Sequence, residues 1–363
     1  MKNRGEAATD RAQSVLLVGY GYAGKRFKKA LDFLQQKEPG LARLVGIVDS
    51  QRSKIGDDFT QAGQFTDLQL ALDQLRPDVA IVCVNEQDHY SVLRRIADSG
   101  VASIVCEKPL TSSLEEAVAL SPALSGRFFS MNMVERFSPI VGDCVRWLDE
   151  HPDLTTGRIE FFWGKHRVRD PRPTMGVCSE VIHPIDLIRL VFKQPKLKLE
   201  RAFSLECDLG VSAESCLDSV FAMFQGADCS VVGQASFAWP TRDRRIVAYH
   251  GGKGKLFRLT MEFDLPRWDC DAFRVVSVDV ATGVWELVHE FVTSNADFPP
   301  ELDQVYKVKQ FLHSSLRASA KETSAVPLVS YDEAVELQRI LASLDEEIHR
   351  GSCGLTRKPF ECV

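Results

Sequence analysis

A glycine-rich segment near the start of the chain has the spacing of a phosphate-binding loop. Gly19–Gly24 reads GYGYAG, a GxGxxG pattern directly after the apolar run Ser14–Val18. In such a loop the first glycine permits a tight turn, the second lets the backbone approach a pyrophosphate, and the third lets the next helix pack on the strand. The helix amino terminus then offers unpaired N–H groups to the phosphates. Glycines also form ordinary turns, but the strand before, the helix after and a downstream acid predict a dinucleotide site.

That acid is Asp49, at the end of the apolar run Leu44–Val48. A carboxylate here accepts hydrogen bonds from the adenine-ribose hydroxyls, which favours NAD, and it repels the extra phosphate of NADP. Ser50 and Arg52 follow, and an arginine can neutralise that phosphate, although Arg52 equally fits a solvated surface charge. We expect NAD, with NADP as the alternative.

A lysine that could transfer a proton follows a later apolar run. Ser103–Cys106 ends in Glu107-Lys108-Pro109. Ligands of doubly wound sheets bind at the carboxyl ends of the strands, so we expect Lys108 to face the nicotinamide. Proline restricts the turn, and a partly desolvated lysine can share a proton with a substrate oxygen. Taken alone, the pattern also fits an ordinary surface lysine.

The order of these motifs resembles the glucose–fructose oxidoreductase, inositol dehydrogenase and rhizopine-catabolism (Gfo/Idh/MocA) family. Besides the loop and the aspartate, the stretch VCVNEQDHYSVLRRIADSGVASIVCEKPL is similar to the one that leads to this family's Glu-Lys-Pro motif. Asn132–Pro139 resembles the start of its second domain and Leu328–Asp345 its carboxy-terminal helix, so the likeness covers nearly the whole chain. It implies a second domain with a large open sheet, whose outer face commonly forms dimers or tetramers.

The loop and the resemblance together indicate a set of cofactor-binding residues. They are Gly19, Tyr20, Gly21, Tyr22, Ala23, Gly24, Asp49, Ser50, Arg52, Val84, Asn85, His89, Glu107 and Lys108. In one place the chain departs from the family, because Asn85-Glu86 replaces the usual Thr-Pro after the fourth strand.

The resemblance also implies an active-site helix within residues 176–187. His183 and Asp186 match the family's histidine and a following aspartate. A histidine with a pKa near neutrality can take or give a proton, although histidines in apolar helices are often packed core residues. The family's other aspartate is replaced by Ser179, which can orient an imidazole but cannot stabilise an imidazolium. Glu180 lies about 100° further round the helix, so it need not substitute.

Substrate binding is expected from this helix and from a cationic segment before it. The segment Lys165–Arg172 suggests a carboxylate or phosphate on the substrate, because arginine binds such groups bidentately; a solvated charged loop is the alternative. The expected substrate contacts are Asn132, Arg136, Ser179, Asp186, Arg169 and Arg172.

Residues 1–131 have the pattern of a Rossmann α/β domain. Short apolar runs alternate with stretches of helical periodicity such as Asp67–Leu75 and Tyr90–Ser99. The runs are Ser14–Val18, Leu44–Val48, Val79–Val84 and Ser103–Cys106. Strands buried on both faces and separated by helices predict a doubly wound parallel sheet.

Residues 132–363 predict a large, mostly antiparallel open-sheet domain of the α+β class. Six runs read as strands: Gly157–Trp163, Ala202–Cys207, Ser219–Phe224, Ser230–Phe237, Lys255–Met261 and Phe273–Val280. Two helices are expected at Glu301–Leu316 and Tyr331–Ile348, the second capped by Ser330.

Composition excludes several classes of protein. A net charge of -6 argues against general affinity for nucleic acid or anionic membranes. No apolar run approaches the roughly 18 residues of a membrane span, and the polar start lacks the apolar core of a signal peptide. The ten cysteines form no CxxC pair or zinc-type cluster, so we expect free thiols in a reducing cytoplasm and no metal site.

The sequence therefore predicts a cytoplasmic NAD(P)-dependent oxidoreductase, a homodimer or homotetramer through the carboxy-terminal sheet. Lys108 and His183 would handle the proton while a hydride moves between nicotinamide and a carbonyl or alcohol carbon. A sugar, a cyclitol or an anionic small molecule is the expected substrate. One alternative is an imine or conjugated C=C reductase acting on a specialised biosynthetic intermediate, which the missing aspartate favours. The other is a non-catalytic nucleotide-sensing regulator, against which the retention of both side chains argues.

Overall fold

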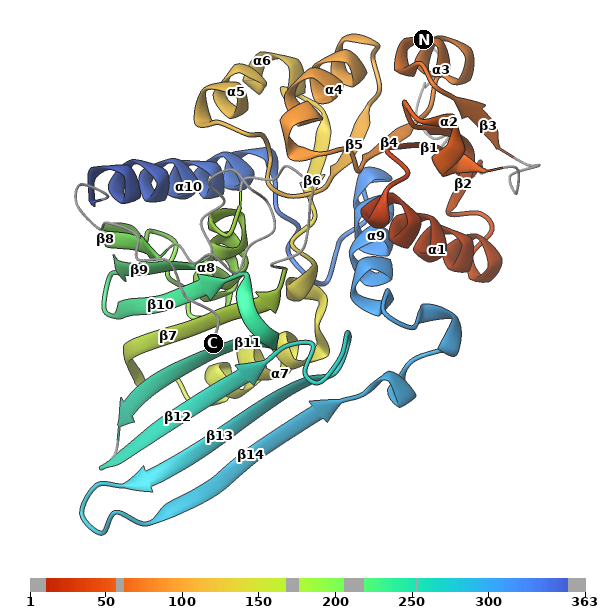
Figure 1. Cartoon of the computed structure of the whole chain (residues 1–363). Coiled ribbons are helices and arrows are strands. Elements are labelled where there is room, and N and C mark those ends of the chain that lie inside the picture. Colours follow the sequence, from red (N-terminus) through yellow and green to blue (C-terminus); the bar gives the residue numbers. More distant parts are fainter. Residues whose placement is uncertain (1–10, 57–61, 168–175, 206–218, 253, 352–363) are drawn as a thin grey trace, which may run out of the picture.

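The first half of the chain forms a parallel sheet with helices on both faces. The computed structural model describes residues 11–56, 62–167, 176–205, 219–252 and 254–351 (Figure 1). Six strands lie in the order β3-β2-β1-β4-β5-β6, and every neighbouring pair is parallel. They are β1 (Gln13–Val18), β2 (Ala42–Val48), β3 (Gly63–Phe65), β4 (Val79–Val82), β5 (Ser103–Cys106) and β6 (Phe128–Met131). The expected Rossmann sheet is confirmed.

The apolar strand runs are continuous because both faces of this sheet are buried. In β1, Leu16 and Val18 belong to one hydrophobic core, whereas Val15 and Leu17 belong to another. The helices of this half are α1 (Tyr22–Lys37), α2 (Arg52–Ile55), α3 (Leu68–Leu75), α4 (Glu86–Asp98), α5 (Leu114–Ala119) and α6 (Ser121–Leu124). A parallel sheet covered on both faces is the usual consequence of strand–helix alternation.

The second half forms a large mixed sheet, as expected. Eight strands lie in the order β14-β13-β12-β11-β7-β10-β9-β8. All neighbours are antiparallel except β7 and β10, which are parallel. The strands are β7 (Thr155–His166), β8 (Lys198–Leu205), β9 (Ser219–Gln225), β10 (Ser230–Ser236), β11 (Ala238–Gly252), β12 (Lys255–Glu262), β13 (Asp271–Asp279) and β14 (Trp285–Thr293).

Helices cover one face of this sheet. They include α7 (Pro139–Glu150), α8 (Cys178–Val191) and α10 (Tyr331–Gly351), which contact β13, β7 and β8 respectively (Figure 1). The other face carries exposed apolar side chains, among them Phe203 and Met223. No helix among the described residues covers that face.

Two strands of the large sheet were not predicted. β11 contains the polar run TRDRR, whose inward-facing Arg244 is buried by ion pairs rather than by apolar contacts. β14 is an edge strand with mostly exposed side chains, so it lacks a buried alternating face. β14 lacks the buried apolar alternation on which the prediction relied, and in β11 that alternation begins only after the polar run, at Ile246 and Ala248.

The helix expected at Glu301–Leu316 begins later than predicted. The 3-10 turns η2 (Asn295–Asp297) and η3 (Pro300–Leu302) come first, and α9 spans Tyr306–Ser319. The start of α9 is set by tertiary contact, because Asp269 accepts hydrogen bonds from the backbone N–H groups of Tyr306 (3.1 Å) and Lys307 (3.5 Å).

The two carboxy-terminal helices return to the first half of the molecule. α9 packs on α1, and α10 contacts β6 and α5 as well as β8. β6 ends at Met131, but the division into residues 1–131 and 132–363 stays a prediction. Within the described ranges, no helix is both long and apolar enough to cross a membrane.

Candidate active site

The glycine loop has the geometry that its spacing predicts. Gly19 has a φ of 92°, and a Cβ there would lie 2.6 Å from the backbone carbon of Cys83. A Cβ at Gly24 would collide with the carbonyl oxygen of Gly19, so the helix can approach the strand only without a side chain. By contrast, a Cβ at Gly21 would meet no atom within 4 Å. The loop therefore leaves open the position where the backbone would meet a pyrophosphate.

A pocket of about 380 Å³ lies beside this loop, at the carboxyl ends of β1, β2 and β4. Six of the expected cofactor residues line it: Gly19, Gly21, Asp49, Ser50, Val84 and Asn85. Asp49 is buried and accepts hydrogen bonds from the backbone N–H groups of Tyr20 (2.8 Å) and Gln51 (2.9 Å). These bonds hold the carboxylate at the pocket wall, where a ribose could reach it. The loop and the acid fit NAD.

Other expected cofactor residues support the pocket from outside. Tyr22 and Ala23 open α1, and Arg52 donates to the backbone oxygen of Gln64 (3.1 Å). His89 is buried between two backbone oxygens, with Nδ1 2.8 Å from that of Pro109 and Nε2 3.2 Å from that of Val84. It therefore joins the end of β4 to the Glu-Lys-Pro turn.

Lys108 reaches across to α8 and binds a buried carboxylate. Its Nζ lies 2.9 Å from Oε1 of Glu180 and donates to the backbone oxygen of Ser179 at 3.3 Å. Lys165, near the end of β7, contacts the same Oε1 at 2.8 Å. One carboxylate oxygen thus holds two amines from opposite sides of the site. The carboxylate beside Lys108 is therefore Glu180, which we did not expect to substitute for the missing aspartate.

The charges around Glu180 have clear electrostatic consequences. Burial raises the pKa of Glu180, but Lys108 and Lys165 outweigh it and hold that pKa well below its usual range. Burial lowers the pKa of Lys165 to about 7, despite the attraction of Glu180. An ionised carboxylate therefore lies between two amines, and the amine of Lys165 can change protonation near neutral pH.

His183 lies in the same cluster and stacks on Trp163, with ring centroids 5.7 Å apart. Burial, reinforced by the positive charge of Lys108, lowers the pKa of His183 well below its usual range. This differs from the pKa near neutrality that the sequence led us to expect, because in this environment the imidazole ring is neutral. Its Nδ1 is buried and has no hydrogen-bond partner among the described residues.

A second buried charge cluster, made of Glu135, Arg244, Asp264, Asp271 and Lys307, adjoins the site through Arg244. Nη2 of Arg244 lies 3.6 Å from Oε2 of Glu180, and its Nη1 donates to Asp264 at 2.9 Å. Lys307 of α9 contacts Glu135 at 2.6 Å and Asp264 at 2.8 Å. Burial raises the pKa of Glu135 against the opposing charge of Lys307.

Two of the expected substrate residues form an ion pair with each other. Arg136 donates to both carboxylate oxygens of Asp186, at 2.7 and 2.5 Å, and to the backbone oxygen of Pro327. Both side chains are buried. This ion pair connects the 3-10 helix η1 (Val134–Phe137) to α8. Both carboxylate oxygens of Asp186 accept hydrogen bonds from Arg136.

The remaining substrate predictions have varied surroundings. The Ser179 hydroxyl donates to the backbone oxygen of Gly176 (2.9 Å), and the Asn132 amide donates to Glu107 (2.8 Å) beside Lys108. Arg169 and Arg172 lie outside the described residues. The roles of all these side chains stay predictions.

The fold and the glycine pocket define a dinucleotide-binding oxidoreductase architecture. Residues 13–126 match the Gfo/Idh/MocA family model, described as an oxidoreductase family with an NAD-binding Rossmann fold. This match covers the part of the chain that holds the glycine loop, Asp49 and the Glu-Lys-Pro turn, and it agrees with the resemblance that these motifs carry. No curated protein matches it in sequence.

Several solved structures share the fold over almost the whole chain. Levoglucosan dehydrogenase, in complex with NADH and L-sorbose, is 16% identical with a TM-score of 0.74, covering 94% of this chain and 97% of its own. The putative oxidoreductase YvaA from Bacillus subtilis is 17% identical with a TM-score of 0.71, covering 93% and 98%. The transcriptional regulator Gal80p from Kluyveromyces lactis is 13% identical with a TM-score of 0.73, covering 94% and 90%.

Proposed function

We propose that this protein transfers a hydride between NAD and a carbonyl or alcohol carbon of a small polar substrate, with Lys108 handling the proton. The observation that carries the proposal is the contact of Lys108 with Glu180. That contact lies at the carboxyl edge of the sheet on which the glycine loop also stands. Bound NADH would supply the hydride, and bound NAD would accept it.

Each side chain has a role that follows from its charge state. In reduction, the Lys108 ammonium donates its proton to the substrate oxygen, and in oxidation the neutral amine takes it back. Glu180 holds the amine in place through the 2.9 Å contact of its Oε1 with Nζ. His183, as a neutral imidazole, would hydrogen-bond a substrate hydroxyl rather than act as the acid that protonates the substrate oxygen.

We propose a sugar, a cyclitol or an anionic small molecule as the substrate. Polar side chains converge at the site, and levoglucosan dehydrogenase, which has the same fold, is described with levoglucosan and L-sorbose. The imine or C=C alternative loses its main support, because Glu180 supplies a carboxylate where none was expected. The regulator alternative is supported only by the fold that this chain shares with Gal80p.

We also propose a cytoplasmic homodimer or homotetramer. The described cysteines are buried free thiols: Cys83, Cys106, Cys144, Cys178, Cys229 and Cys270. Such thiols are compatible with a reducing compartment. The exposed apolar face of the large sheet supports assembly of identical subunits.

The test is Lys108→Ala, assayed with NADH and NADPH against keto-sugars, keto acids and cyclic imines. Turnover should fall about 10²-fold or more, because a proton-transferring group is lost. The Kd for NADH, measured by fluorescence titration, should stay within twofold of wild type. Glu180 keeps Lys165 as a partner in this variant, so the fold should survive.

Lys108→Arg is the matched control, because it keeps a cation beside Glu180 but cannot release a proton. It should be as inactive as the alanine variant. Full activity in either variant would remove Lys108 from the chemistry. A wild-type protein that binds NADH but converts no compound would favour the regulator, and one that binds neither nucleotide would end the proposal.

A further inference from the structure

Arg242 is a partly exposed arginine for which the described residues provide no hydrogen-bonding partner. Alternation along β11 places it on the inner face of the sheet together with Arg244. Its side chain is 23% exposed, and its guanidinium carbon lies 3.7 Å from the centroid of the Trp268 ring. An arginine stacked in this way keeps its N–H groups in the plane of the guanidinium, where they can donate.

The nearest acid to Arg242 is already engaged by other groups. Oδ2 of Asp264 lies 3.8 Å from Nη1 of Arg242, but it accepts a hydrogen bond from Arg244 at 2.9 Å. The other oxygen of Asp264 accepts from Lys307 at 2.8 Å. Among the described residues Arg242 forms no hydrogen bond, and burial together with Arg244 lowers its pKa. Its N–H groups are therefore available to donate to a ligand.

Arg242 stands between the glycine-loop helix and the lysine site. Arg26 of α1 also lies over Trp268, at 4.4 Å from the ring centroid. Arg26 also lies over the ring of Tyr22, the first residue of α1, at 5.8 Å from the ring centroid. On the other side, Arg244 is two residues along the strand and contacts Glu180, which holds Lys108. A ligand that joins the nucleotide to the lysine would therefore pass close to Arg242.

We propose that Arg242 binds an oxyanion, a carboxylate or a phosphate, of the ligand that reacts at Lys108. This inference rests on the proposed function and narrows its substrate class to anionic compounds. The diphosphate of the nucleotide carries the same chemistry and is the other source of such a group. Arginine suits either, because its planar fork donates two parallel hydrogen bonds to an oxyanion.

The test compares Arg242→Gln with Arg245→Gln. Arg245 is the matched control: it lies on the outer face of the same strand, also stacks on an aromatic ring (Phe162, 4.8 Å), and pairs with Asp243. Three measurements apply to each variant: the Kd for NADH, KM and kcat for D-glucuronate against D-glucose, and calorimetric binding of inorganic phosphate to the NAD-loaded protein. Circular dichroism and thermal melting confirm folding, and Arg242→Lys provides a variant that keeps the charge.

If the oxyanion belongs to the substrate, Arg242→Gln raises KM for the acidic sugar about tenfold or more, from the loss of a charge-assisted hydrogen bond. It also weakens phosphate binding, while kcat and the neutral sugar are unaffected. If the oxyanion belongs to the nucleotide, the Kd for NADH rises instead by a similar factor. In both cases Arg242→Lys restores part of the loss.

The inference is overturned if all three measurements for Arg242→Gln stay within twofold of wild type and of Arg245→Gln. Failure of the proposed function looks different, because the wild-type protein itself would then bind no pyridine nucleotide or would convert no compound. Phosphate binding to the nucleotide-free protein would still report on Arg242 in that case.

Discussion

The contacts of Glu180 are the main difference between the site in the structure and the site expected from the sequence. The family motif directs attention to Ser179, but the hydroxyl of Ser179 donates to the backbone of its own turn. Glu180, one residue on, contacts both Lys108 and Lys165. Two amines share one carboxylate oxygen beside a neutral histidine, an arrangement that supports the proposed role of Lys108 in proton transfer.

Lys165 should therefore titrate near neutrality. Its pKa is lowered to about 7, so the amine is protonated below that pH and mostly neutral at pH 8. Only the neutral amine reacts with acetic anhydride. Competitive acetylation followed by peptide mass spectrometry should place the midpoint for Lys165 near pH 7, with exposed Lys193 as the internal comparison.

The variant Glu180→Gln tests the direction in which Glu180 shifts the pKa of Lys165. Glu180 raises the pKa of Lys165 against burial, so removing its charge should move the acetylation midpoint to lower pH. A midpoint that moves upward, or one that lies near 10 in the wild type, would contradict the electrostatic account.

Helix α9 is held by a buried charge rather than by apolar packing alone. Lys307 is 1% exposed and lies within 3.3 Å of three carboxylates, those of Glu135, Asp264 and Asp271. Burial lowers its pKa, but these acids outweigh burial and raise that pKa well above the usual value. The network joins η1, the β12–β13 hairpin and α9 at one point beneath the site.

Lys307→Met should be strongly destabilising. The substitution removes one of the two cations of the cluster, leaving Arg244 for Glu135 and Asp264. Breaking a buried ion pair in this way costs about 3–5 kcal/mol. Urea denaturation should show this as a lower midpoint. Lys309→Met, on the same helix but half-buried and outside the network, should change the free energy of unfolding by less than about 1 kcal/mol. Equal effects of the two substitutions would refute the role of the network.

The elements differ in how far local sequence predicts them. β1, β4 and β5 are short apolar runs, and their burial on both faces could be predicted from composition. β11 could not, because its polar run is buried only when Arg244 meets acids from η1 and the β12–β13 hairpin. The start of α9 likewise depends on Asp269, a residue 37 positions from Tyr306.

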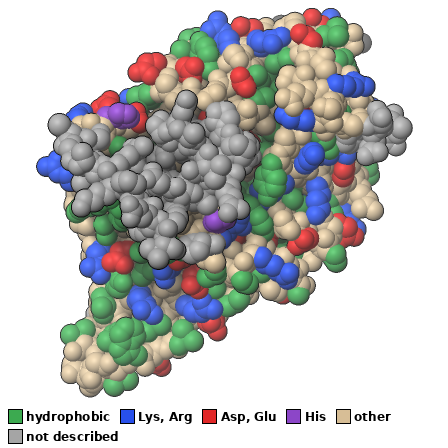
Figure 2. All heavy atoms as spheres, in the orientation of Figure 1, with side chains coloured by type: hydrophobic (Ala, Val, Ile, Leu, Met, Phe, Trp, Pro, Cys, Tyr) green, Lys and Arg blue, Asp and Glu red, His purple; other side chains and the backbone are tan. Residues whose placement is uncertain are grey.

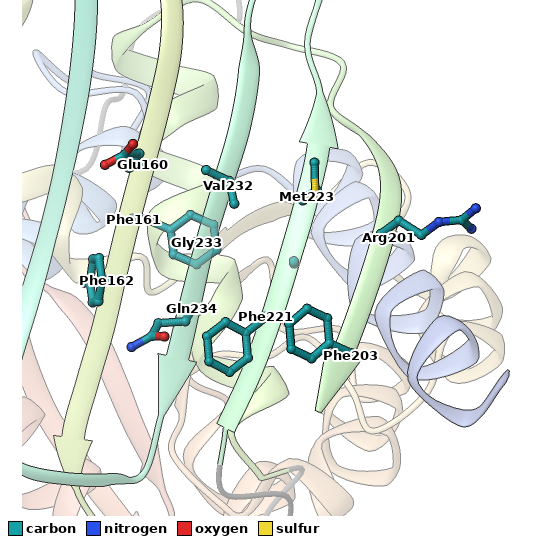
Figure 3. Close-up of a pocket in the computed structure, with 11 residues that line it drawn as sticks. Glu160, Phe161, Phe162, Arg201, Phe203, Phe221, Met223, Val232, Gly233 and Gln234 are labelled. Atoms are coloured by element: carbon teal, nitrogen blue, oxygen red, sulfur yellow. The ribbon is translucent and has the colours of Figure 1, made fainter. Parts of the chain in front are cut away.

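For the whole molecule, the outer face of the large sheet is the main unpaired surface in the described part of the chain. Phe203 stacks on Phe221 at 4.8 Å and is 54% exposed. With Met223 and Val232 these rings line a depression of about 300 Å³ (Figure 3). Further hydrophobic side chains gather at the tip formed by the β13–β14 turn, where Val280, Val284 and Trp285 are exposed (Figure 2). Large exposed apolar patches commonly mark interfaces.

Phe203→Glu combined with Met223→Glu should therefore disrupt subunit assembly. A charge placed in an apolar interface must be desolvated, which opposes association. Light scattering after size exclusion should show a dimer or tetramer for the wild type and a smaller species for the double variant. Leu70→Glu, a similarly exposed position on α3, is the control and should leave the mass unchanged. A monomeric wild type would refute this interface.

Local patterns were sufficient to predict that the glycine loop, Asp49 and Lys108 follow the ends of strands, because an apolar run precedes each of them. The two kinds of sheet follow from the same patterns. The charge cluster around Glu180 was decided only by the folded chain, since Glu180 lies on α8 and its partners Lys108, Lys165 and Arg244 come from the turn after β5, from β7 and from β11. Ion pairs between such distant segments depend on how helices pack on sheets, and periodicity along the chain carries no information about that packing.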